Sequence, residues 1–162
     1  MPRTSRSLRL FALALALPLA ALLSCKSDGS PTAPTIESTT FAPSLGVDLS
    51  ASTKTSTGLY YRDLITGTGA TAASGHSLSV HYTGWLANGT QFDTNVAPTT
   101  PFPLTLGIGQ VIAGWDQGLV GMKVGGRRQL IIPPSLGYGS NPNGTIPANS
   151  ILVFTVDLIS TQ

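Results

Sequence analysis

The segment 78–86 constrains the fold of this chain more than any other. Four of its five alternate positions, beginning at Leu78, carry large apolar side chains, which is the period of a β-strand with one buried face. Asn88-Gly89 follows, and these two residue types suit the positive φ angles of a tight hairpin turn. Residues 91–94 are then the return strand. The pattern predicts an antiparallel hairpin, and hence a fold built on an antiparallel sheet.

Two further runs extend this sheet, and one segment departs from its period. Residues 151–159 are apolar on nearly both faces, which indicates a central strand. Residues 128–132 form another strand, which ends at Pro133-Pro134 because proline lacks the N–H that a ladder needs. Large apolar side chains recur at helical spacing over 112–122. We therefore expect an α+β domain, an antiparallel sheet covered by one short helix.

The first 24 residues have the pattern of a secretory signal peptide. Three arginines lie within the first nine positions, and residues 10–23 form a run of 14 uncharged, mostly apolar residues. A helix that spans a membrane needs about 20 such residues, and Pro18 interrupts this run. A buried core helix is the alternative reading of the same run.

The apolar run ends in Leu22-Leu23-Ser24-Cys25, which resembles the lipobox of bacterial lipoproteins. By that resemblance Cys25 is lipidated and anchors the mature protein to a membrane. The location it implies is the bacterial cell envelope, with Lys26 after the cysteine favouring the outer membrane, facing the periplasm. Plain secretion with a free thiol is the alternative. The chain has a single cysteine, and secreted proteins seldom keep an unpaired thiol, so lipidation is favoured.

Residues 25–57 differ in composition from the rest of the chain. They are rich in Ser, Thr and Pro, and their few apolar residues follow no period of 2 or 3.6. So little apolar surface favours a disordered tether, because burial cannot offset the entropy of ordering it. A structured N-terminal extension is the alternative. Residues 58–162 then form the folded domain.

The charge balance and the reactive residue types exclude several functions. The whole chain has a formal net charge of +2, but without residues 1–24 six basic residues face seven acidic ones, a net charge of −1. A nucleic-acid partner is therefore not expected. Residues 58–162 contain no cysteine, only His76 and His81 as imidazoles, and no Gly-x-Ser-x-Gly motif. We expect no metal, no cofactor and no hydrolase chemistry. His81 and the pair Arg127-Arg128 are interpreted as structural, the two arginines as a solvated start of a strand.

A series of short strings within 58–162 resembles the FKBP-type peptidyl-prolyl cis–trans isomerases. In chain order they are Val80-His-Tyr-Thr-Gly84, Gly89-Thr-Gln-Phe-Asp93, Pro101-Phe102, Gly109-Gln-Val-Ile-Ala-Gly-Trp115, Gly118-Leu-Val-Gly-Met122, Tyr138-Gly139, Ile146-Pro147 and Leu152-Val-Phe154. The resemblance implies a half-barrel antiparallel sheet wrapped around a short helix, with a substrate pocket between them.

The resemblance also implies a role for each matching residue. Trp115 is the floor beneath the substrate proline ring, the Asp93 carboxylate and the Tyr138 hydroxyl are polar contacts, and the Ile112 N–H holds a substrate carbonyl. Each of two roles has an alternative. Asp93 could bond only a local backbone N–H, and Trp115 could be an ordinary core residue. The implied catalytic residues are Tyr82, Asp93, Trp115 and Tyr138. The implied substrate-binding residues are Tyr82, Phe92, Asp93, Phe102, Val111, Ile112, Trp115, Tyr138, Ile146 and Phe154.

The implied activity is isomerisation of Xaa–Pro bonds in proline-containing polypeptides of the envelope, and the implied pocket also accepts macrolide ligands. A non-catalytic binding module of the same fold, or a chaperone that grips proline-containing segments, is the alternative. Two departures from the family pattern motivate it. Leu104 stands where an aromatic is common, which should loosen one wall, and the loop 140–145 is shorter than in well-known members and lacks their histidine.

Overall fold

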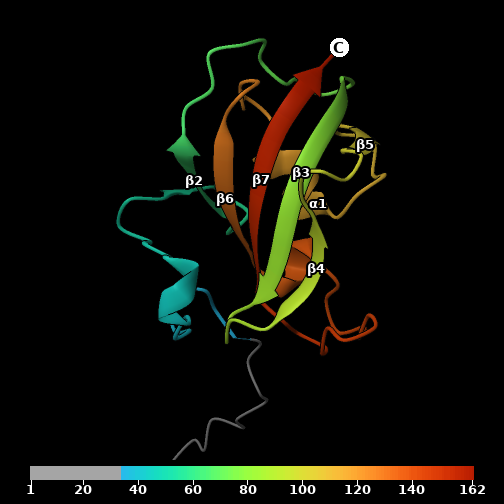
Figure 1. Cartoon of the computed structure of the whole chain (residues 1–162). Coiled ribbons are helices and arrows are strands. Elements are labelled where there is room, and N and C mark those ends of the chain that lie inside the picture. The colour runs from blue at the N-terminus through green and yellow to red at the C-terminus, as the bar shows by residue number, and fades with distance from the viewer. Residues whose placement is uncertain (1–33) are drawn as a thin grey trace, which may run out of the picture. The chain divides into compact units, whose positions relative to one another are not determined.

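Every strand pairing within residues 34–162 is antiparallel, as the hairpin at 78–94 predicts. The computed structural model describes residues 34–162, and Figure 1 shows the sheet with the short helix α1 lying against it. The sheet order is β1-β2-β6-β7-β3-β4, with β5 pairing to a further part of β3. The elements are the 3-10 helix Pro43–Leu45, β1 Thr53–Lys54, β2 Tyr60–Ile65, β3 Ser77–Leu86, β4 Gln91–Asn95, β5 Phe102–Thr105, α1 Ala113–Gly118, β6 Arg127–Ile132, the 3-10 helix Pro134–Leu136 and β7 Leu152–Thr161. The α+β prediction is confirmed.

Strand β7 lies in the middle of the sheet, as its apolar sequence predicts. It pairs with β6 on one side and with β3 along nearly its whole length on the other, and Figure 1 shows β3 and β7 side by side. Leu152 and Phe154 face the main core on the α1 side, while Val153 faces a second apolar cluster on the other side. Both faces are covered at this end of the strand, which is why its sequence does not alternate between apolar and polar.

Two glycines bring α1 close to β6. A Cβ added at Gly114 would lie 2.5 Å from the Ile132 side chain, and one at Gly118 would lie 2.7 Å from Leu130. Glycine costs about 1 kcal/mol relative to alanine inside a helix, so its use twice in six residues indicates that close packing decides these positions. This close packing determines the distance between α1 and the sheet. No helix within residues 34–162 has the length and apolar character needed to cross a membrane.

Residues 34–57, which we call the N-terminal strap, are packed against the sheet, and the prediction of a disordered tether is wrong for them. Ile36 is 2% exposed and packs with Tyr60, Ile131, Ile151 and Val153 on the sheet face opposite α1. Phe41, Leu45, Val47 and Leu49 flank this second cluster. The strap has no regular period because it follows an irregular path, yet it supplies the apolar cover that this face of the sheet requires. The folded domain therefore begins well before residue 58.

Polar contacts hold the strap along its length. Gln129 donates from Nε2 to the Leu45 carbonyl at 2.7 Å, and Arg62 donates to the Gly46 carbonyl at 2.9 Å. Glu37 accepts hydrogen bonds from Lys54 and from the Tyr60 hydroxyl, which lower the pKa of its carboxyl to about 2. The predicted signal peptide 1–24, Cys25 and the start of the tether lie outside the described residues.

Arg128 is buried, and its interpretation as a solvated residue is wrong. Its side chain is 5% exposed and points toward α1, because it shares a face of β6 with Leu130 and Ile132. Nε and Nη2 donate to the two carboxylate oxygens of Asp63 at 2.6 and 3.1 Å. Nη1 donates to the carbonyls of Gly118 and Val120 at 2.8 and 3.0 Å. Arg128 therefore ties the C-terminal end of α1 to β2 and β6.

Candidate functional site

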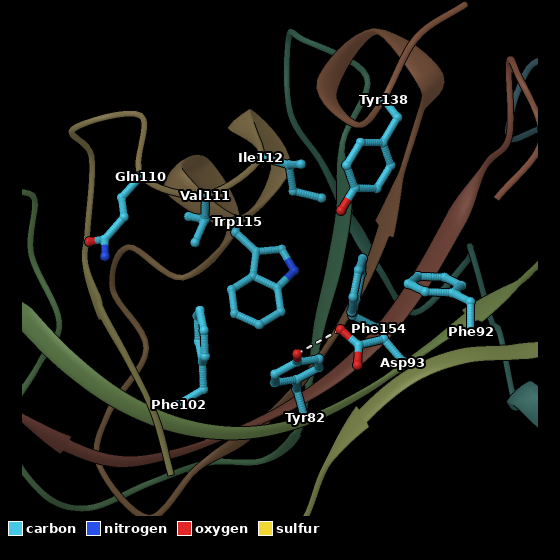
Figure 2. Close-up of a pocket in the computed structure, with 10 residues that line it drawn as sticks. All are labelled: Tyr82, Phe92, Asp93, Phe102, Gln110, Val111, Ile112, Trp115, Tyr138 and Phe154. Atoms are coloured by element: carbon cyan, nitrogen blue, oxygen red, sulfur yellow. Dashed lines mark hydrogen bonds between the residues drawn. The ribbon is translucent and has the colours of Figure 1, made fainter. Parts of the chain in front are cut away.

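A cavity of about 500 Å³ opens between α1 and the sheet. Its lining is mostly aromatic and aliphatic, with a few polar groups, which is the usual make-up of a ligand pocket. Figure 2 shows the side chains converging on it from β3, β4, β5, β7, α1, the segment before α1 and the segment after β6. The lining residues are Tyr82, Phe92, Asp93, Phe102, Gln110, Val111, Ile112, Trp115, Tyr138 and Phe154.

Trp115 is the centre of the aromatic group. It lies in the first turn of α1, is 4% exposed, and lies edge-on to Tyr82 and Phe154, with ring centroids 5.1 and 5.3 Å apart. Phe102 packs against both Tyr82 and Trp115 in the same edge-on manner. Such T-shaped pairs are favourable for aromatic rings and fix their orientation. These contacts fix the orientation of the indole ring, which lies among the other lining side chains in Figure 2.

A hydrogen-bonded pair, Tyr82 and Asp93, forms the polar part of the wall. The Tyr82 hydroxyl donates to Oδ2 of Asp93 at 2.7 Å, and Oδ1 accepts from the Thr94 N–H at 2.8 Å. Asp93 thus makes both the local backbone bond and a bond within the cavity. Burial, and next the bond to Asp93, raise the pKa of the Tyr82 hydroxyl, which therefore stays protonated at neutral pH and keeps donating. The arrangement holds one carboxylate at the cavity wall.

The segment before α1 is held by side chains that accept from its backbone. Asp116 accepts from the N–H groups of Gly107 and Gly109, both at 2.8 Å, and Gln110 accepts through Oε1 from the Thr105 N–H at 2.7 Å. These bonds fix the loop that presents Val111 and Ile112 to the cavity. Among residues 34–162, the N–H of Ile112 has no acceptor, so it is available to a ligand.

Tyr138 reaches the cavity from the turn after β6. Figure 2 shows its hydroxyl directed into the cavity, on the side across from Phe102. The turn is closed by the Gly139 N–H donating to the Pro134 carbonyl at 2.9 Å, and Gly139 in turn accepts from the Asn149 N–H at 2.7 Å. The hydroxyl has no hydrogen-bond partner within the described part of the chain. It is therefore a second free donor at the cavity.

The structure brings nine of the ten predicted substrate-binding residues to this cavity, and their roles there stay predictions. Ile146 is the exception: it is 5% exposed and packs in the main core. Its backbone forms a bridge with Asn143, which turns its side chain inward. Gln110 lines the cavity and was not predicted, although it directly precedes Val111 in the matching string.

Leu104, which stands where an aromatic residue is common in the family, does not loosen the cavity wall. Leu104 is buried in the main core, opposite Leu78 in the pairing of β5 with β3, and it is absent from the cavity lining. His81 faces the other side of β3, where Nδ1 lies 2.9 Å from the Asn95 side-chain oxygen, in keeping with a structural role. Within residues 34–162, no three His, Cys, Asp or Glu side chains form a cluster that could hold a metal ion.

Comparisons with a family model and with known relatives point to the same protein family. Residues 69–159 match the model of the FKBP-type peptidyl-prolyl cis–trans isomerase family. A FK506-binding protein of Neisseria meningitidis serogroup B is 50% identical over 103 residues, which are 63% of this chain and 94% of that protein. FK506-binding protein 2 of Dictyostelium discoideum is 59% identical over 87 residues, 53% of this chain and 65% of that protein.

Solved structures agree with these relatives. The crystal structure of AtFKBP13 superposes with a TM-score of 0.64 at 35% identity, covering 68% of this chain and 98% of that one. The crystal structure of FkpA from Escherichia coli also gives a TM-score of 0.64, at 37% identity, covering 69% of this chain and 52% of that one.

Proposed function

Since this chain belongs to the FKBP-type peptidyl-prolyl cis–trans isomerase family, we propose that it accelerates Xaa–Pro rotation by stabilising a twisted amide in the Trp115 cavity. The cavity itself carries this proposal. It is aromatic, it has a volume of about 500 Å³, and three polar groups converge on it, namely the Tyr82–Asp93 pair, the Tyr138 hydroxyl and the Ile112 N–H. A proline ring fits against the indole of Trp115, and the polar groups can then hold the carbonyls on either side.

The physical problem is the partial double bond of the amide. Resonance gives a rotation barrier of about 18–20 kcal/mol, and exchange at an Xaa–Pro bond takes tens to hundreds of seconds without a catalyst. The twisted amide has lost this resonance and with it part of its charge separation. An apolar cavity therefore disfavours the planar amide more than the twisted one, which is differential binding of the transition state.

The donors of the cavity add to this effect without forming a covalent bond. The Ile112 N–H can hold one substrate carbonyl in place while the other end of the bond turns. The Tyr138 hydroxyl can donate to the carbonyl that has rotated. Asp93 keeps the Tyr82 hydroxyl engaged, so that the ring of Tyr82 stays edge-on to Trp115. No nucleophile, metal or cofactor takes part in the reaction proposed here.

The proposal is tested by peptide isomerisation with the full-length chain, in mild detergent because of the apolar run 10–23. Micromolar protein should accelerate exchange of a short Xaa–Pro peptide, and Asp93→Ala should lower kcat/KM roughly tenfold, since bonds to charged groups contribute about 1.5–3 kcal/mol. Tyr138→Phe should lower it by about 2–10-fold. Unchanged activity in both variants would contradict the assigned roles.

The same experiment separates catalysis from simple binding. Several relatives are named FK506-binding proteins, so we propose that the cavity also accepts this class of macrolide. A wild-type chain that binds FK506 but leaves the peptide at its uncatalysed rate would be a binding module. Competition by FK506 against isomerisation would place both in the same cavity.

We propose on sequence grounds that Cys25 carries a lipid and that the substrates are envelope or secreted proteins. The basic start, the apolar run and the lipobox-like Leu22-Leu23-Ser24-Cys25 support this. Mass spectrometry of the mature N-terminus, from cells that process such signals, should show an acylated Cys25. An unmodified cysteine at this position, or a chain that still begins at Met1, would contradict the anchor.

A further inference from the structure

The N-terminal strap contacts the hairpin that carries one wall of the cavity. The Ala42 N–H donates to the Ala87 carbonyl at 2.8 Å, and Ala87 lies in the turn between β3 and β4. Gly89, in the same turn, has φ +88°, and a Cβ added there would lie 3.0 Å from the Cβ of Ala42. The strap and the hairpin are therefore joined by a hydrogen bond and lie so close that a side chain at residue 89 would press on Ala42.

The hairpin in turn determines where two lining residues lie. Strand β4 is the last strand of the sheet order, and within residues 34–162 it pairs with β3 alone. Its register with β3 shifts between Asp93 and Gln91, which leaves Phe92 as the extra residue of a bulge. A bulge disrupts the ladder locally, so the ladder alone holds this stretch less firmly. Phe92 packs edge-on to Phe154 at 5.5 Å, and its neighbour Asp93 binds the Tyr82 hydroxyl.

The strap is a firm support because its other contacts are on the far strands of the sheet. Ile36 is buried against β2, β6 and β7, and Gln129 on β6 holds the Leu45 carbonyl just after Ala42. Arg62 on β2 holds the next carbonyl, that of Gly46. The strap thus links β2 and β6 to the hairpin at the opposite edge of the sheet. It also lies entirely outside the residues 69–159 that match the family model.

We propose that the N-terminal strap positions the β4 wall for catalysis, with Ala42 as the contact that fixes the hairpin and, through it, Phe92 and Asp93. This rests on the proposed function, because Asp93 and Phe92 are part of the cavity that function uses. Ala42 is a positioning residue in this scheme and touches no substrate.

Ala42→Pro tests the proposal by removing the hydrogen bond between the strap and the hairpin. Ala42 has φ −59°, which proline adopts readily, while its N–H, the donor to Ala87, is removed. In the full-length chain we expect kcat/KM to fall about 3–10-fold, chiefly through a higher KM, and the affinity for FK506 to fall by a similar factor. Val47→Ala is the matched control, since it loosens the strap cluster away from the hairpin. It should lower the melting temperature and leave kcat/KM within twofold.

A double-mutant comparison distinguishes positioning from a general loss of stability. If the strap acts through the β4 wall, the losses from Ala42→Pro and Asp93→Ala should not multiply, whereas independent effects multiply. Multiplying losses, or a folded Ala42→Pro variant within twofold of wild type in both KM and FK506 affinity, would overturn the proposal. Should Ala42→Pro fail to fold, Ala42→Leu replaces it, because a larger side chain at residue 42 presses on the hairpin at Gly89. The same rise in KM is expected, and the same contrary outcome applies.

The outcomes also separate this proposal from the proposed function. A wild-type chain without isomerase activity that still binds FK506 contradicts catalysis, and the FK506 affinity of Ala42→Pro then decides the role of the strap. A wild-type chain that shows neither isomerase activity nor FK506 binding contradicts both the proposed function and the role of the strap.

Discussion

Gly84→Ala should lower kcat/KM for an Xaa–Pro peptide by roughly 10–100-fold, because one methyl group displaces two aromatic walls of the cavity. Gly84 lies on β3 on the same face as Tyr82, opposite Phe154 on β7 and Asp93 on β4. A Cβ at this position would lie 2.7 Å from ring atoms of both Phe154 and Phe92. Overpacking of this kind costs about 1–3 kcal/mol, and each 1.4 kcal/mol lost from transition-state binding is a factor of ten.

The measurement is the peptide isomerisation assay together with the affinity for FK506, both on full-length variants. Thr83→Ala is the control on the same strand, since Thr83 is on the opposite face and its hydroxyl is 3.0 Å from that of Thr94. It should keep activity within about twofold, the usual range for surface changes. Adding Phe92→Leu to Gly84→Ala should recover part of the loss by making room for the methyl group. If Gly84→Ala keeps full activity and unchanged FK506 affinity, the rings of Phe92 and Phe154 make room for the methyl group and the prediction is wrong.

The parts of this structure that could be predicted from sequence are those with local signals. The hairpin of β3 and β4 follows from alternation and Asn88-Gly89, and β7 from its apolar run. The cavity residues follow from short strings that resemble a known family, and most of those strings lie in or beside regular elements. The signal in each of these stretches lies in residues close in the sequence, so it is visible in one chain, although the contacts that form the cavity join distant strands.

The strap and Arg128 could not be predicted, for two different physical reasons. The strap packs through Ile36 and its apolar neighbours at irregular intervals, and an irregular path leaves no period to detect. Its polar composition also resembles that of a linker. Arg128 is buried because it bonds Asp63, 65 positions away, and two carbonyls at the end of α1. Ile146 is similar, since a local bridge turns its side chain toward the core.

Arg128→Met should lower the free energy of unfolding by about 2–4 kcal/mol. The loss comes less from the ion pair than from the carbonyls, because the Asp63 side chain keeps 37% exposure and can be solvated by water. The Gly118 carbonyl loses a donor in a buried place, at a cost of about 1–3 kcal/mol for an unsatisfied group, and the partly buried Val120 carbonyl adds less. Guanidinium unfolding of the full-length chain measures the change, with the slope checked for constancy.

Arg127→Met is the matched control, because the two arginines are adjacent and both bind a carboxylate through two nitrogens. The Arg127 side chain is 46% exposed, and its bonds to Asp157 at 2.6 and 3.0 Å lie at the surface. Exposed pairs contribute about 0–1 kcal/mol, so this variant should unfold nearly as wild type does. Asp63→Asn should fall between the two, since it weakens the pair but keeps both carbonyl bonds of Arg128. Equal losses for Arg127→Met and Arg128→Met would mean that the bonds of Arg128 to the end of α1 contribute nothing to stability.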